Sequence, residues 1–277
     1  AGFALFARDF GIAVVLRFLT GFTLAGVYPV GVKIVAQWTR DRLGWGLGVL
    51  VGALTLGKAF PYLLLALGAA LGWRALMLST SVLAAAGGCV IRFGLADGPF
   101  LSGAAPFDLR AAFRVFRRRA FRLQSFGYFG HMWELYTFWS LAASFLAAAP
   151  AVREGRFPVP VALAAFLTIG AGVAGCVAGG WLSRTMGERR VALVSLAVSG
   201  TFCALSWLLF RLPGWILLPA FIIWGFFVVA DSAQFSALAA RTCSSQYTGT
   251  ALTIQNGIGF AVTAVSIPFT AWIAQSL

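Results

Sequence analysis

Ionisable residues occur inside long apolar stretches of this sequence; they are Arg17, Lys33, Lys58, His131, Glu134 and Asp231. A charged side chain at the centre of a bilayer costs about 2.5–3.5 kcal/mol on insertion scales. Residues of this kind are therefore expected to pair with one another or to carry the chemistry of the protein.

His131 and Glu134 form a candidate pair for proton chemistry. They are three residues apart, so we expect them on one helical face, and Tyr128 extends that face. A buried carboxyl group can take up and release a proton, and histidine titrates near neutral pH. We therefore predict that this pair couples to protons. The alternative is that Glu134 is paired permanently with Lys58 or Arg17.

Lys58 and Arg17 are candidates for binding negative charge. Lys58 lies near the middle of its apolar stretch and follows Gly57, so we predict that it lines a central cavity. An ion pair with a carboxylate on another helix is the alternative. Arg17 shares a helical face with Gly21 and Ala25, at four-residue spacing. It would bind an anion or tune a neighbouring carboxylate, unless it extends outward to water from the helix end.

The sequence gives weaker indications of function for the remaining polar residues of the apolar stretches. Asp231 and Lys33 lie towards the ends of their stretches, so we expect both to be in contact with water. Tyr128, Gln255 and Asn256 could form hydrogen bonds with a substrate. Neutral polar side chains also join membrane helices to one another, which is the alternative for these three.

The composition identifies the elements that must position these residues. The chain has 277 residues, of which 60% are hydrophobic and 10% charged, and its mean hydropathy is +0.89. A soluble domain carries roughly a quarter charged residues, so a soluble fold is excluded, as is a disordered chain. About 20 apolar residues in a helix cross a bilayer. We predict an all-α polytopic membrane protein with spans at 11–36, 43–70, 74–92, 122–149, 158–182, 190–210, 213–236 and 247–273.

The arginines predict how these spans are oriented. Thirteen arginines fall in one set of alternating loops, around positions 40–42, 92–122, 184–190 and 241, and five fall in the opposite set. Lysine and arginine are retained on the cytoplasmic side, so the first set is expected to be cytoplasmic. The net charge of +13 is then a consequence of topology, and it requires no nucleic-acid partner.

The polar stretch 94–121 divides the predicted bundle into two parts. We expect residues 1–93 and 122–277 to belong to two helical bundles, with 94–121 as a cytoplasmic linker. Part of that linker, Asp108 to Arg119, could form a helix on the inner surface of the membrane. The chain lacks an initiator methionine and begins and ends in apolar helical sequence, so we expect it to be truncated at both ends.

Enzymatic chemistry has no support in the sequence. There is one histidine, and the four cysteines are scattered without metal-ligand spacing. A phosphate-binding loop is absent, which argues against an ATP-driven pump. We expect no metal, no cofactor and no catalytic residue.

Small residues at regular spacing carry a family resemblance. An arginine is followed by small residues and a proline at Arg17, Gly21, Ala25, Gly26 and Pro29. This pattern resembles the fourth helix of the major facilitator superfamily of transporters. The glycines at positions 44, 48, 52 and 57 are similar to its glycine-rich fifth helix, and the sequence at 72–74 is similar to the start of its sixth.

A further motif resembles the cytoplasmic loop that recurs in both halves of that family. It runs from Gly180 to Arg190 and includes Gly187, Arg189 and Arg190. Arg184 stands where that motif usually has an acidic residue, so a gating role of the loop is in doubt. The order and spacing of the motifs resemble helices four to eleven of twelve, over nearly the whole chain.

The resemblance implies a two-bundle secondary transporter in the plasma membrane, as in a bacterial inner membrane. Its substrate would bind near the midplane between bundles that rock about it. Substrate-binding residues would be Arg17, Lys58, Tyr128, Gln255 and Asn256, and protons would couple through His131 and Glu134. Gating or structural roles would fall to Gly21, Pro29, Gly180, Gly187, Arg189, Arg190 and Asp231.

The two cations favour a small anionic substrate, such as an organic acid or an inorganic oxyanion. Apart from substrate, protons and lipid, no partner is expected, and we expect a monomer. The alternatives are a proton-coupled exporter of drugs or metabolites and a transport-inactive membrane sensor on the same fold.

Overall fold

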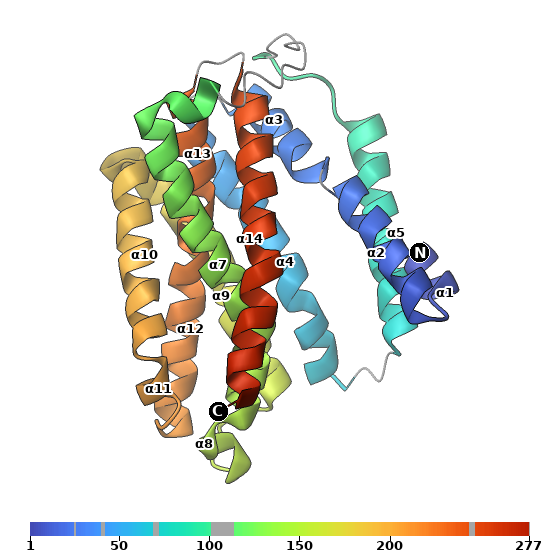
Figure 1. The fold of residues 1–277 in the computed structure, drawn as a ribbon, viewed down its shortest axis with the longest axis vertical. Helices are drawn as coiled ribbons and strands as arrows, with labels where there is room; N and C mark the ends of the chain where they lie inside the picture. The colour runs from blue at the N-terminus through green and yellow to red at the C-terminus, as the bar shows by residue number, and fades with distance from the viewer. Residues whose placement is uncertain (25, 40–41, 69–71, 101–113, 244–246, 277) are drawn as a thin grey trace.

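The computed structural model describes residues 1–24, 26–39, 42–68, 72–100, 114–243 and 247–276, and these ranges hold helices and no strand. The all-α prediction is confirmed. The helices run side by side, as Figure 1 shows. Their bounds are α1 Gly2–Phe6, α2 Phe10–Leu24, α3 Val27–Trp38, α4 Leu43–Ala66, α5 Trp73–Gly94, α7 Arg119–Ala148, α8 Pro150–Arg153, α9 Val161–Met186, α10 Glu188–Ala204, α11 Ser206–Leu209, α12 Gly214–Ala230, α13 Ser232–Thr242 and α14 Thr248–Ser276.

Six segments within the described residues are long and apolar enough to cross a membrane. They are Phe10–Trp38, Leu43–Ala66, Trp73–Gly94, Val161–Met186, Gly214–Thr242 and Thr248–Gln275. All eight predicted segments coincide with helices, and six of them meet this criterion of length and hydropathy. The segment predicted at 122–149 forms α7, but its polar side chains lower its hydropathy. The segment predicted at 190–210 is divided into α10 and the short α11, with Leu205 between them.

Two of the expected spans are broken in the middle. The first consists of α2 and α3, and Pro29 lies in the first turn of α3, where its missing N–H is tolerated. The second break lies at Asp231, which is both the C-cap of α12 and the N-cap of α13. A break of this kind places backbone and side-chain polar groups inside the bundle.

Glycines bring α9 into close contact with α4 on one side and α12 on the other. A Cβ on Gly48 would lie 2.6 Å from the carbonyl oxygen of Cys176, and one on Gly180 would lie 2.8 Å from that of Gly44. Real Cβ atoms essentially never approach closer than 3.0 Å, so glycine is required at these positions. On the other side of α9, Cys176 donates a hydrogen bond to the carbonyl of Val229 in α12, at 3.6 Å.

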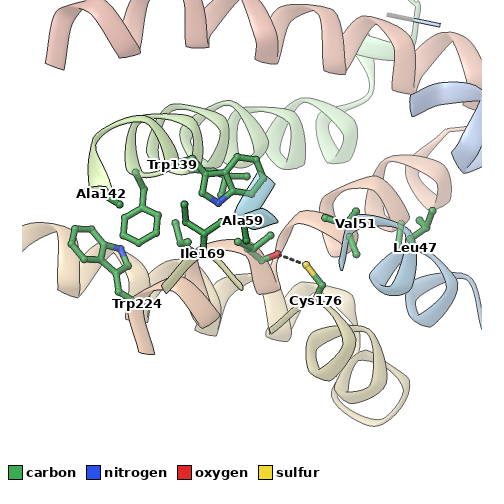
Figure 2. Packing of buried hydrophobic residues seen from close by; sticks show 14 of the residues in the cluster. Leu47, Val51, Ala59, Trp139, Ala142, Ile169, Cys176 and Trp224 are labelled. Carbon is green, nitrogen blue, oxygen red and sulfur yellow. Dashed lines mark hydrogen bonds between the residues drawn. The ribbon is translucent and has the colours of Figure 1, made fainter. Parts of the chain in front are cut away.

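Apolar side chains fill the space between these helices. Figure 2 shows Trp139 of α7 beside Ala59 of α4 and Ile169 of α9, with Trp224 of α12 further along the same core. All four residues are buried. The helix pair α4–α9 therefore joins the N-terminal part of the chain to the C-terminal part.

The first helices form a separate group. Helices α1, α2 and α5 lie together at the right of Figure 1, where Phe3 packs edge-on against Trp73. Neither α2 nor α5 has a buried residue. Side chains on such a surface face lipid in a membrane protein, which agrees with their apolar composition.

The linker begins where α5 ends, at Gly94. Its first residues dock on the end of α3, because the backbone N–H of Gly98 donates to Gln37 Oε1 at 3.1 Å. Residues 108–113, half of the surface helix predicted from Asp108 to Arg119, lie outside the described residues, and residues 114–117 are helical. The division into bundles at 1–93 and 122–277 stays a prediction.

Candidate functional site

Helix α7 contacts three different parts of the bundle, and most of the candidate residues lie on it or face it. Three residues along an α-helix correspond to a rotation of about 300°, so residues at this spacing are offset by about 60° around the axis. His131 and Glu134 therefore lie on one side of α7 and interact electrostatically, as expected. Their bonding partners differ, because His131 pairs with Asp231 and Glu134 bonds to Ser199 of α10.

His131 is paired with Asp231. Its Nδ1 lies 3.0 Å from Asp231 Oδ1, and both side chains are 1% exposed. On the other side of the ring, Nε2 lies 2.8 Å from Ser232 Oγ, within hydrogen-bond distance. The break between α12 and α13 brings these two partners towards α7. The contact is within ion-pair distance, but neither His131 Nδ1 nor Asp231 Oδ1 has a hydrogen-bond partner in the described part of the chain.

Asp231 is thus not the water-exposed helix-end group that we expected. It lies 11 residues from the end of α13, about 16 Å at 1.5 Å per residue, which is near the middle of a hydrocarbon core of about 30 Å. Its second oxygen, Oδ2, is buried and has no hydrogen-bond partner in the described part of the chain. Lys33, by contrast, is exposed on α3 as expected.

Glu134 faces α10. Its Oε2 accepts a hydrogen bond from Ser199 at 3.1 Å. Among the described residues, neither Lys58 nor Arg17 forms an ion pair with it, so the alternative of a permanent pair with either cation is wrong. Glu134 nevertheless interacts electrostatically with both Asp231 and His131, which places the three titratable groups in one cluster.

A third face of α7 contacts α14 through polar side chains. Gln124 Nε2 donates to Gln255 Oε1 at 2.7 Å, and Tyr128 Oη donates to Asn256 Oδ1 at 2.8 Å. Within the described residues, Gln255 Nε2 and Asn256 Nδ2 are buried without a hydrogen-bond partner. The three residues proposed for hydrogen bonding to substrate therefore form one ladder. These hydrogen bonds join α7 to α14. The side-chain NH₂ groups of Gln255 and Asn256 remain without an acceptor in the described part of the chain.

Lys58 is exposed, and it lines a pocket between α4, α7 and α9. The pocket has a volume of about 380 Å³ and is lined by Lys58, Pro61, Tyr62, Leu65, Trp139 and Ile169. The ammonium group lies 5.8 Å from the centre of the Tyr136 ring and 5.7 Å from that of Trp139, within reach of cation–π attraction. None of the carboxylates that the structure describes forms an ion pair with Lys58.

Arg17 does not join Lys58. It is exposed on α2, and its guanidinium group lies 4.3 Å from the centre of the Phe3 ring in α1. Gly21, on the same helix, has no described atom within 4 Å of the position of a Cβ. The structure therefore separates this part of the predicted site from the pocket.

The loop motif between α9 and α10 forms the tight turn that joins these two helices. Gly187 has φ +80°, a left-handed conformation that favours glycine, and it joins the two helices. Arg189 and Arg190 are exposed. The neighbouring Glu188 forms an ion pair with Arg241 at the end of α13, at 2.7 Å. Sequence reasoning missed this pair.

Another contact missed from the sequence links the two parts of the chain. Tyr28 Oη of α3 lies 2.9 Å from Ser236 Oγ of α13, and either atom could be the donor. Ser236 lies one helical turn beyond Ser232, the partner of His131. No spacing rule in the sequence connects residues 208 positions apart, so only the fold reveals this contact.

A bundle of membrane-spanning helices that buries the titratable groups His131 and Asp231 is typical of membrane transport proteins. The chain matches the family model of the Major Facilitator Superfamily over residues 1–267, and it belongs to that family. It is therefore an integral membrane protein and a secondary transporter with this family's fold. Comparisons with curated proteins and with solved structures gave no match.

Proposed function

We propose that this transporter moves a small anionic solute by alternating access and couples that movement to protons. The observation that carries the proposal is Lys58, a cation in a pocket of a membrane-spanning helix without a described carboxylate partner. A cation in such a place is costly, and an anion bound there would compensate its charge.

The position of the pocket supports alternating access. Arg42, Arg122, Arg184 and Arg241 lie at one end of the bundle, and we call this the arginine-rich end. The glycine contacts between α4 and α9 lie towards that end, whereas Lys58 lies nearer the opposite ends of these helices. A bundle packed closely at one end with a pocket towards the other is the arrangement expected of one half of a transport cycle.

The proton site in this proposal is the pair His131–Asp231, with Glu134 as a nearby third group. The titratable groups facing the pair from the surrounding elements are Glu134 on α7 and Cys176 on α9, both of which interact electrostatically with Asp231. Tyr128 of α7 also packs against the His131 ring, with 6.1 Å between centres. Ser236 lies on the same helix as Ser232, the partner of His131, and it contacts Tyr28 of α3. We therefore expect a change at the His131–Asp231 pair to alter the contact between α3 and α13.

Replacing Lys58 by glutamine tests the proposal. A hydrogen-bonded contact with a charged group contributes about 1.5–3 kcal/mol, and 1.4 kcal/mol corresponds to a factor of about ten. We therefore expect K58Q to lower anion counterflow by about ten-fold or more. The assay uses the intact protein in lipid vesicles and labelled phosphate, nitrate, succinate and benzenesulfonate.

Lys33→Gln is the matched control, because it removes one positive charge from an exposed position on α3. It should exchange anions at the wild-type rate. Counterflow of a neutral or cationic solute, but of no anion, would favour an exporter of another substrate class. Complete absence of counterflow with every solute would favour the transport-inactive sensor.

A further inference from the structure

The pocket around Lys58 has one charged group and an otherwise apolar or aromatic lining. Its walls are the side chains of Pro61, Leu65 and Ile169 together with the rings of Tyr62 and Trp139. A volume of about 380 Å³ is within the range of pockets that bind small organic molecules. It exceeds what a single inorganic oxyanion fills, so an organic body is needed to displace the water.

The charge of the pocket limits the charge of its occupant. Lys58 is the one cation among the lining residues that the structure describes. It can compensate one negative charge. A second negative charge on the same ligand would have no cation in the described lining to compensate it.

The aromatic rings favour a flat apolar body next to the anionic head group of a ligand. Tyr136, Trp139 and Tyr62 surround Lys58 from two helices, α7 and α4. Aromatic groups attract one another in offset or edge-to-face arrangements. These rings would therefore pack against an aromatic or branched aliphatic body more favourably than against a hydrated polyol.

We propose that the pocket binds an organic monoanion, a carboxylate or sulfonate on an apolar, ring-sized body, with Lys58 holding the anionic head group. This inference rests on the proposed function and narrows its substrate class. It sets aside the inorganic oxyanions and dicarboxylates that the sequence alone left open.

Ligand pairs that differ by one charge test the inference. Benzoate carries one charge, isophthalate adds a second carboxylate to the same ring, and benzamide removes the charge. Because neutral weak acids cross bilayers unaided, binding is measured on the purified intact protein, from the rise in melting temperature with ligand concentration. We expect benzoate to bind at least ten-fold more tightly than isophthalate and benzamide.

Two variants connect the result to the pocket. K58Q should abolish the preference for benzoate over benzamide. Tyr62→Leu removes one aromatic ring of the lining, and it should weaken benzoate binding about five-fold. Trp133→Leu is the control, since Trp133 is outside the pocket and packs against Phe269. It should bind benzoate as the wild type does.

The outcomes separate the inference from the proposed function. If isophthalate, phosphate or sulfate binds more tightly than benzoate and K58Q removes that binding, the monoanion inference is overturned and anion transport through Lys58 stands. If K58Q binds every anion as the wild type does, both are overturned. Equal binding of benzoate by Tyr62→Leu and the wild type would overturn the packing of the ligand against the aromatic rings of the lining.

Discussion

Replacing Gly225 by alanine is expected to leave little folded protein. A Cβ at this position in α12 would collide with the carbonyl oxygen of Thr168 in α9. The same pair of helices meets at Gly175, where a Cβ would collide with the carbonyl oxygen of Phe226. Because both obstacles are backbone atoms, no side-chain rotation relieves them, and the helices must move apart. Overpacking of this kind costs about 1–3 kcal/mol and occasionally more, and we expect the upper end.

The measurement is the melting temperature and the monodisperse fraction of the purified variant in detergent. Gly170→Ala is the matched control on α9, where the nearest atoms to a Cβ are 4.0 Å away. It should behave as the wild type does. A Gly225→Ala protein with the yield and melting temperature of the Gly170→Ala control would show that α9 and α12 are not packed as described.

Replacing Asp231 by asparagine is expected to abolish proton-driven accumulation while anion exchange continues. Asparagine has nearly the same shape as aspartate but cannot carry the proton. For one proton per anion, a gradient of one pH unit supplies about 1.4 kcal/mol, which corresponds to about ten-fold accumulation. We expect this ratio to fall to about one in D231N, with counterflow retained. His131→Gln should have the same effect, because it removes the partner of Asp231.

Asp97→Asn is the control, since Asp97 is an exposed carboxylate in the linker. It should keep the ten-fold ratio. Glu134→Gln tests whether Glu134 of α7, and not Asp231 at the α12–α13 break, is the proton site. The two can be distinguished because Glu134 is bonded to Ser199 and not to His131. Should D231N accumulate anion as the wild type does while Glu134→Gln does not, the proton site is Glu134, and the assignment to the His131–Asp231 pair is wrong.

The sequence predicted the helices well because their apolar length is a local property. Helices α7 and α10 lie where spans were predicted, although α7 is too polar and α10 too short to meet the criterion of length and hydropathy. The breaks before Val27 and at Asp231 were not anticipated. A break depends on what neighbouring helices offer to the free backbone groups, and this is a property of the folded bundle.

The sequence predicted which residues belong to the candidate site, but it did not predict which of them contact one another. His131, Asp231, Glu134 and Lys58 were all identified as ionisable residues in apolar sequence, because the cost of burying a charge is visible there. That His131 selects Asp231, 100 positions away, could not be derived from spacing along one helix. The same limit hid the contact of Lys58 with Trp139, whose ring centre lies 5.7 Å from the ammonium group.

The most direct test of the account is the pH inside vesicles that contain the intact protein when benzenesulfonate is added outside. This anion stays ionised, so it carries no proton across the bilayer by itself. With no imposed gradient, proton-coupled uptake through Lys58 predicts that the lumen becomes acidic, and that K58Q vesicles and protein-free vesicles do not. A lumen that becomes alkaline, that does not change, or that becomes acidic equally in K58Q would contradict the account.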